Sequence, residues 1–312
     1  WLKTPLGLAV GRNWDGPVDH TVRVVRFDDL EEKPVATLLH YACHPTIMAW
    51  QNQLFTPDFP GVARKVVEDQ IGGTCLFLQG AAGDIGPTYG FTGDLKVYRR
   101  LGTMLGLEAA SVAAKLVTLP RRHEVTRIQA SGAPIAIYDD LPDEPAEPIF
   151  RIESRMIKLP LQTLPSIAEV ERKVHESVDA LNRLRKSNAP EEEVRLATAK
   201  AVVAEDKLVT IREHEGKTHV DWRMIGIRIG DVALLSVPGE PLTDVNQAIV
   251  KGSPFAHTLF SGYSNGGFGY LPTAKQYSGG GYEVESSPFA QDASDVLVAE
   301  GCDTLNRLWA MR

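Results

Sequence analysis

The sequence predicts a large mixed α/β domain. Two nearly all-apolar segments, residues 35–43 (VATLLHYAC) and 74–78 (TCLFL), have the composition of strands that are buried on both faces. Helical segments with one apolar face lie at about residues 62–70 and 101–116. This alternation of buried strand and amphipathic helix is typical of α/β proteins. The third observation is a long helical hairpin in the middle of the chain.

The first third of the chain supplies the strands of this prediction. Residues 21–27 (TVRVVRF) have a strand composition, and a turn separates them from the buried strand at 35–43. Pro45 follows that strand and ends it, because proline cannot donate to a sheet ladder. The second buried strand leads into a glycine-rich turn, GAAGDIGP.

The middle third is different. Strand-like segments lie near residues 124–129 and 150–161, and the acidic, proline-rich residues 139–148 are expected to form a solvated loop. Residues 166–213 predict an antiparallel helical hairpin, because apolar residues recur at steps of three and four in both halves. Asn188 and Glu191 have the spacing of a capping box for the second helix. We find no linker, so we expect one domain over residues 1–312 with the hairpin as an insertion. Such a hairpin can also serve as a partner-binding arm.

The last third returns to α/β structure. Strands are expected at residues 221–229, 232–237 and 257–263, and Glu240 is expected to open a helix. A glycine-dense loop covers residues 262–282, and a last helix begins near Asp292.

Composition excludes some classes of protein. The chain has 312 residues, 43% hydrophobic and 23% charged, as soluble globular proteins do. A formal charge of -7 and the lack of a Lys/Arg block argue against nucleic-acid binding. No apolar run reaches the ~20 residues of a membrane span. The cysteines are sparse and lack C-x-x-C spacing, which favours buried free thiols.

Candidate functional residues follow the predicted strands, where α/β folds place their sites. His44 follows the strand at 35–43, and imidazole is a common metal ligand and general base, although a core histidine bonded to backbone is the alternative. Glu240 follows the strand at 232–237, although a helix dipole also favours a carboxylate there. The loop at 262–282 contributes Tyr270, Tyr277 and Tyr282. Long loops of this kind are usually functional or disordered, and the aromatic residues favour function.

Other motifs are weaker. The turn GAAGDIGP lacks the Lys-Ser/Thr of a phosphate-binding loop, and no H-E-x-x-H occurs. The residues alone therefore indicate an α/β enzyme and leave metal dependence open.

Six blocks in order resemble the catalytic domain of the neutral/alkaline, non-lysosomal ceramidase family. They are GPVD at 16–19, ACHPT at 42–46, TPDFPG at 56–61, LQGAAGDIGP at 78–87, PGE at 238–240, and GYSN…GYLPT…GGYE at 262–283. The blocks span nearly the whole chain, and their order is more specific than any single block. The resemblance implies that family's large mixed α/β domain, without the immunoglobulin-like C-terminal domain of the true ceramidases.

The resemblance also implies a zinc ion, Zn2+. The family holds zinc with two histidines, a glutamate and a tyrosine, which assigns His44, Glu240 and Tyr270 as metal ligands. Tyr282 matches the family tyrosine that polarises the substrate carbonyl, so it is the expected catalytic residue. Arg12 corresponds to an arginine that lines the substrate pocket.

Two departures from the family pattern change the expectation. The first zinc histidine of the family lies upstream of anything in this chain, which begins at Trp1 without a methionine. We therefore expect a missing N-terminal segment to supply it. A family serine that contacts the ceramide amide falls on Gly86, so we expect a substrate other than ceramide.

The function implied is a zinc-dependent, ceramidase-like amidase, a hydrolase of lipid metabolism. It would cleave a linear amide bond of an N-acyl or amphiphilic substrate through attack of a metal-bound water. A lactonase or esterase with the same metal site is one alternative, and a catalytically inactive binding homologue is another.

Overall fold

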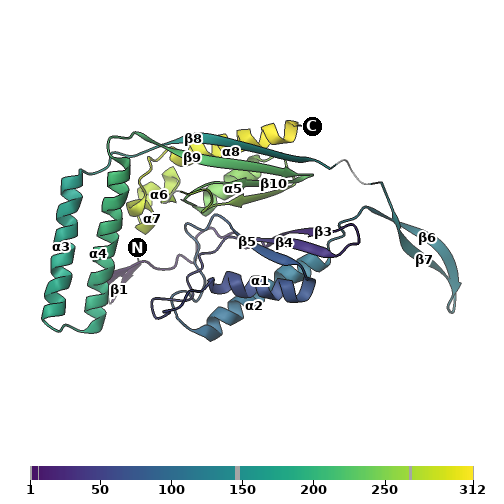
Figure 1. Cartoon of the computed structure of the whole chain (residues 1–312), viewed down its shortest axis with the longest axis horizontal. Helices are drawn as coiled ribbons and strands as arrows, with labels where there is room; N and C mark the ends of the chain where they lie inside the picture. Colours follow the sequence, from purple (N-terminus) through teal and green to yellow (C-terminus); the bar gives the residue numbers. More distant parts are fainter. Residues whose placement is uncertain (1, 6, 145–147, 267–268, 312) are drawn as a thin grey trace.

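The structure is a computed structural model that describes residues 2–5, 7–144, 148–266 and 269–311. Figure 1 shows a body of sheets and helices, with a helical hairpin at one end and a β-ribbon at the other. Every helix in the described residues is too short or too polar to cross a membrane.

Two main sheets form the body within the described residues. The first has the spatial order β12 (His257–Ser261), β10 (Val232–Ser236), β9 (His219–Ile229) and β8 (Phe150–Pro160), and the second has the order β3 (Arg23–Asp28), β4 (Pro34–Tyr41) and β5 (Thr74–Gln79). β10 pairs parallel with β12 and antiparallel with β9. β4 likewise pairs parallel with β5 and antiparallel with β3. The mixed α/β architecture is therefore confirmed.

Helices cover each sheet and enclose two apolar cores. α5 (Thr243–Gly252) and α8 (Ala293–Ala310) lie on the first sheet, and α1 (Asp58–Ile71) and α2 (Leu95–Ala114) lie on the second (Figure 1). Leu235, Ile249 and Leu297 are fully buried in the first core, and Leu39 and Val67 are fully buried in the second. Burying a side chain of this size stabilises the fold by roughly 1.5–3 kcal/mol.

Side-chain bonds tie the two sheets together. His40, in β4, lies within 2.8 Å of the Phe260 carbonyl of β12 through its Nε2 atom. The Ser261 hydroxyl donates to the Gln79 carbonyl at 3.1 Å, so β5 is also joined to β12. These bonds bring the ends of β4, β5 and β12 to one place.

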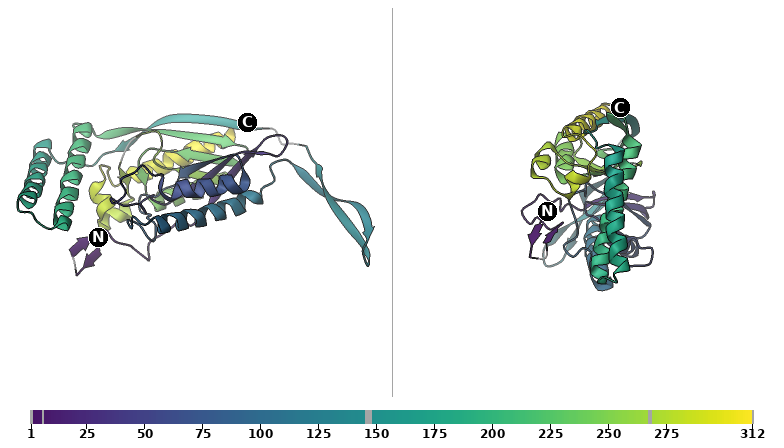
Figure 2. Two further views of the ribbon diagram at one scale, coloured as in Figure 1. Left: turned by 60° about the horizontal axis from the view of Figure 1, so that its bottom comes forward. Right: turned by 90° about the vertical axis from the view of Figure 1, so that its left-hand side faces the viewer.

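The predicted helical hairpin is confirmed. It consists of α3 (Ile167–Lys186) and α4 (Glu191–His214), which pack together and extend from the body (Figure 2). The predicted capping box is wrong. Pro190 is the N-cap residue, no side chain caps this end, and Asn188 has a φ of 52° outside the helix. The turn between the helices fixes that left-handed backbone, which asparagine tolerates.

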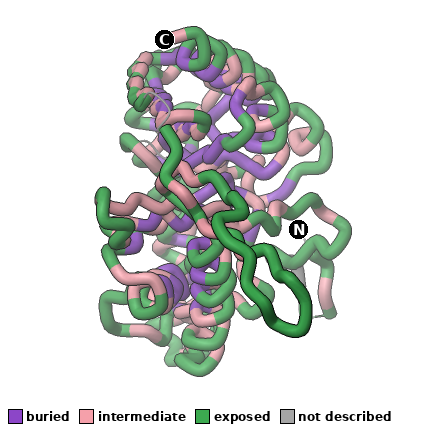
Figure 3. Tube along the Cα trace, turned by 90° about the vertical axis from the view of Figure 1, so that its right-hand side faces the viewer, coloured by how far each residue is buried: buried purple, intermediate pink, exposed green. Residues whose placement is uncertain are grey.

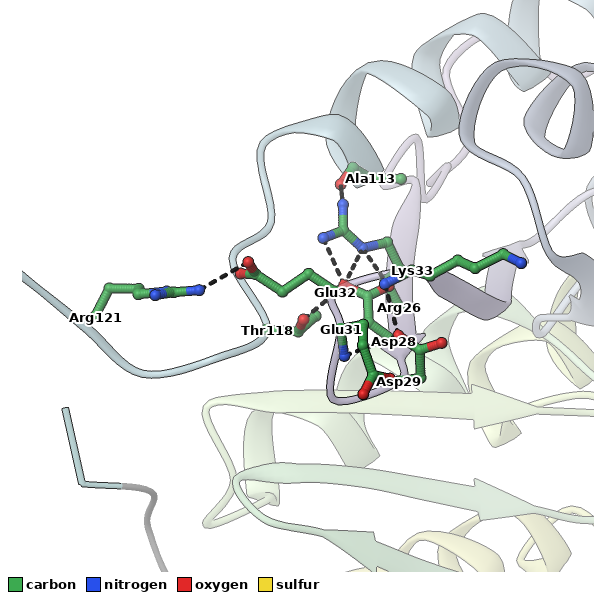
Figure 4. Close-up of polar contacts among 9 residues, drawn as sticks. All are labelled: Arg26, Asp28, Asp29, Glu31, Glu32, Lys33, Ala113, Thr118 and Arg121. Carbon is green, nitrogen blue, oxygen red and sulfur yellow. Dashed lines mark hydrogen bonds and ion pairs between the residues drawn. The ribbon is translucent and has the colours of Figure 1, made fainter. Parts of the chain in front are cut away.

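The β-ribbon consists of β6 (Arg121–Ala130) and β7 (Pro134–Pro142), and Figure 3 shows that it is exposed along its length. The prediction of a solvated loop is therefore wrong for Asp139–Pro142, which pair with β6, whereas residues 145–147 lie outside the described residues. Pairing with β6 makes this segment a strand, although its acidic composition is typical of a loop. At the base of the ribbon Arg121 bonds Glu32 at 2.7 Å, and Thr118 bonds Asp28 at 2.6 Å (Figure 4).

The remaining elements are short. They are β1 (Leu2–Thr4), β2 (Gly7–Ala9), β11 (Glu240–Pro241), β13 (Tyr270–Leu271), α6 (Ala274–Gly279) and α7 (Tyr282–Ser286).

Candidate functional site

The candidate site lies where the chain leaves parallel strands. His44 follows β4, Glu240 follows β10, and Tyr263 follows β12. Because parallel strands end at the same edge of a sheet, the residues after them gather there. The cross-sheet bond of His40 then joins the edge that holds His44 to the edge that holds Tyr263.

Glu240 does not open a helix, so that prediction is wrong. It lies in β11, which pairs parallel with β13 so that Glu240 is opposite Tyr270, and α5 begins only at Thr243. Gly239 makes this possible with a φ of 67°, and a Cβ there would lie 2.4 Å from the Trp222 ring. The strand pairing, which is a tertiary contact, overrides the local helix-start signal of the P-G-E sequence.

His44 is held by backbone on one side and faces Glu240 on the other. Its Nδ1 donates to the Ile85 carbonyl at 3.1 Å, and its Nε2 lies 3.1 Å from Glu240 Oε2. Burial alone would lower the pKa of His44. The carboxylate of Glu240 and the Ile85 carbonyl outweigh that effect and raise the pKa above its ordinary value.

The glycine-rich turn after β5 packs directly against β11. Gly83 donates its N–H to the Pro241 carbonyl at 3.2 Å, and a Cβ at Gly83 would lie 2.5 Å from the Glu240 carbonyl oxygen. Asp84 accepts from the Thr243 N–H at 2.9 Å, at the start of α5. The turn is therefore a structural support for Glu240.

Three tyrosines surround the His44–Glu240 pair. The Tyr263 hydroxyl lies 3.2 Å from both His44 Nε2 and Glu240 Oε2. Tyr270 is paired with Glu240 across β11 and β13, and its ring centroid lies 6.5 Å from that of His44. Tyr282 packs edge-on against the Tyr270 ring with centroids 5.8 Å apart. Burial and the charge of Glu240 raise the pKa of Tyr263 and of Tyr270, so both phenols keep their protons at neutral pH.

The structure differs from the sequence-based expectation for two tyrosines. Tyr277 bonds the Phe289 carbonyl at 2.7 Å, away from the His44–Glu240 pair. Tyr263 was not singled out, although it lies at the end of a predicted strand within GYSN. Strand-end position, the signal that selected His44 and Glu240, would have found it.

Arg12 lies apart from this cluster in the contacts of the described residues. It is exposed, and its guanidinium lies 5.5 Å from the centroid of the Trp14 ring. Its role at a substrate pocket stays a prediction.

The described residues contain no group of three or more His, Cys, Asp or Glu side chains able to hold a metal. His44 and Glu240 supply one nitrogen and one carboxylate, and the Tyr263 hydroxyl lies beside both among the described residues. Tyrosine oxygen is a hard donor, and a nearby dication favours its ionised form. The chemistry of this donor set is therefore compatible with zinc, which binds N and O ligands.

The loop sequence also contains a motif that is typical of hydrolases with a serine nucleophile. Residues 262–266 read G-Y-S-N-G, which has the G-x-S-x-G spacing of a nucleophile elbow. Ser264 Oγ, however, bonds the Gly262 carbonyl at 3.1 Å and Ser261 Oγ at 3.3 Å, and His44 faces Glu240 and Tyr263 instead. Among the described contacts, Ser264 therefore forms no pair with a histidine.

Comparison with known proteins gives matches at the level of structure. No family model matches the chain, and no curated protein matches it. The neutral ceramidase from Pseudomonas aeruginosa matches with a TM-score of 0.57 and 18% identity, over 93% of this chain and 47% of that one. A ceramidase complexed with C2 matches with a TM-score of 0.57 and 17% identity, over 96% of this chain and 50% of that one. The chain thus spans about half the length of the solved structures that it matches. The predicted resemblance in fold is confirmed: this chain has a neutral ceramidase-like fold.

Proposed function

We propose that this chain is a zinc-dependent hydrolase that cleaves a linear amide bond in an N-acyl or other amphiphilic substrate. The observation that carries the proposal is the convergence of His44, Glu240 and Tyr270 in a ceramidase-like fold, with the imidazole Nε2 3.1 Å from a carboxylate oxygen. These three residues, from distant parts of the sequence, would hold the zinc ion.

The orientation of His44 supports a cation at this position. Because the Ile85 carbonyl can only accept, Nδ1 carries a proton and the neutral ring presents its Nε2 lone pair to Glu240. Two lone pairs at 3.1 Å repel each other unless a proton or a cation lies between them. A backbone carbonyl on the second imidazole nitrogen is also the usual way in which proteins orient a metal-binding histidine.

Each residue then has a defined task. A bound zinc ion supplies Lewis acidity and lowers the pKa of a water molecule to about 7. Tyr282, beside Tyr270, donates its phenol O–H to the substrate carbonyl oxygen, where negative charge develops. Arg12 is proposed to contact the polar part of the substrate.

Metal analysis of the purified chain tests the proposal. We expect one zinc per chain, and His44→Ala and Glu240→Ala should each weaken zinc binding by more than the roughly 10–100-fold that loss of an outer-shell partner costs. His123→Ala is the matched control, because His123 forms a second histidine–carboxylate pair, with Asp140 at 2.7 Å, on the exposed ribbon. It should bind zinc as the wild type does. Retention of full zinc affinity by both site variants would refute the proposal.

A panel of N-acyl amides and lactones, assayed with chelator and after zinc is restored, identifies the reaction. Amide cleavage that chelator abolishes supports the proposal, whereas lactone or ester cleavage alone would replace the amidase with a lactonase or esterase. Tyr282→Phe should lower kcat by about 100-fold, since it removes one oxyanion donor, and it should leave zinc affinity unchanged. A chain that binds no zinc and cleaves none of these substrates would be a binding homologue.

A further inference from the structure

The Tyr263 hydroxyl makes a closed triangle with two proposed zinc ligands. Tyr263 Oη lies 3.2 Å from His44 Nε2 and 3.2 Å from Glu240 Oε2, and the third side, between Nε2 and Oε2, is 3.1 Å. The Tyr263 ring packs edge-on against the imidazole with centroids 5.9 Å apart. The three polar atoms therefore lie within hydrogen-bonding distance of one another.

The size of this triangle matches one face of a zinc coordination tetrahedron. Zinc–nitrogen and zinc–oxygen bonds of about 2.0–2.1 Å place neighbouring tetrahedral ligands about 3.3 Å apart. The three sides of 3.1, 3.2 and 3.2 Å need to widen only slightly to reach that spacing.

The backbone holds Tyr263 in this position at some cost. Its φ of 58° is left-handed, which is unusual for a large side chain. The Tyr263 N–H donates to the Gly239 carbonyl at 2.8 Å, which fastens the residue to the turn that also presents Glu240. Strained residues that the surroundings hold in this way cluster at functional sites.

We propose that Tyr263 is a metal ligand that acts together with His44, Glu240 and Tyr270. The inference rests on the proposed function, because it concerns the same metal. Four protein ligands still allow activity, because zinc in catalytic sites expands to five-coordination.

Tyr263→Phe tests the inference, because it keeps the ring that packs on His44 and removes only the oxygen. Tyr277→Phe is the matched control, because it removes a hydroxyl from the same loop. The Tyr277 hydroxyl donates to the Phe289 carbonyl and not to a proposed zinc ligand. Zinc affinity is measured by competition with a chromogenic chelator. We expect Tyr263→Phe to weaken zinc binding by at least about 10-fold, the lower bound for loss of even an outer-shell partner, and Tyr277→Phe to bind as the wild type does.

A second readout does not depend on activity, and its wild-type value does not depend on the folding of a variant. Zinc bound by phenols converts them to phenolates, which the ultraviolet difference spectrum counts. We expect two phenolates per zinc in the wild type and one in Tyr263→Phe. One phenolate per zinc in the wild type would overturn the inference, as would unchanged zinc affinity in Tyr263→Phe.

The outcomes separate the two proposals. If His44→Ala and Glu240→Ala keep full zinc affinity, the proposed function fails. If both lose zinc while Tyr263→Phe binds it with wild-type affinity, only the role of Tyr263 fails.

Discussion

His40 makes the free energy of unfolding depend on pH in a way that can be calculated. The side chain is 1% exposed, its Nε2 donates to the Phe260 carbonyl, and its buried Nδ1 has no hydrogen-bond partner among the described residues. Burial disfavours the imidazolium and lowers the pKa of His40 from 6.5 to about 4. The folded protein therefore holds His40 neutral at pH values at which the unfolded chain protonates it.

The sign and size of the effect follow by linkage. Below pH 6.5 the unfolded chain binds the proton more readily than the folded one, so the free energy of unfolding falls as the pH falls towards 4. With these two pKa values the contribution of His40, relative to pH 7, is a loss of about 2 kcal/mol at pH 5 and about 3 kcal/mol at pH 4.

His40→Gln removes the titration, and its amide N–H can still donate to Phe260. Urea unfolding, followed by tryptophan fluorescence at pH 7, 6, 5 and 4, gives the free energy of unfolding of both proteins. Any packing defect of glutamine is the same at every pH, so the change with pH is the diagnostic quantity. The variant should gain about 3 kcal/mol on the wild type between pH 7 and pH 4.

His175→Gln, on the exposed side of α3, controls for the loss of one imidazole. It should follow the pH dependence of the wild type. A difference between wild type and His40→Gln that stays constant from pH 7 to pH 4 would refute the reasoning, because it would mean that His40 is protonated as readily in the folded state as in the unfolded one.

Two further predictions concern the close packing at Gly83 and the burial of Cys43 and Cys75. Gly83→Ala should lower the free energy of unfolding by about 1–3 kcal/mol and weaken zinc binding, because its Cβ would lie 2.5 Å from the Glu240 carbonyl oxygen and displace it. Gly86→Ala is the control, because its Cβ would meet nothing within 4 Å, and it should change the free energy of unfolding by less than about 0.5 kcal/mol. Urea titration checks both, and equal effects would contradict the close approach at Gly83. Cys43 and Cys75 should react with a thiol reagent only as the protein unfolds, because burial raises their pKa values to about 12 and about 11 and the thiolate is the reactive form. Immediate labelling of both cysteines in the native protein would contradict this.

The sequence was sufficient wherever structure follows from local pattern. Continuous apolar runs predicted β4 and β5, and the three-and-four spacing predicted α3 and α4, because burial on two faces or on one helical stripe requires those patterns. The same reasoning failed for β7, whose acidic residues pair with β6 without burying an apolar face.

The candidate site shows where sequence reasoning stops. His44 and Glu240 could be selected because each follows a predicted strand, but they are 196 residues apart, and their 3.1 Å contact depends on the packing of two separate sheets, which the His40–Phe260 and Ser261–Gln79 bonds hold together. Tertiary pairing also placed Glu240 in β11 opposite Tyr270 and brought the Tyr263 hydroxyl to both side chains. The sequence by itself determined the buried strands and the amphipathic helices, since their apolar patterns depend on neighbours along the chain. Only the tertiary structure decided which donor atoms meet, because that depends on strand register and on close backbone approach at Gly83 and Gly239.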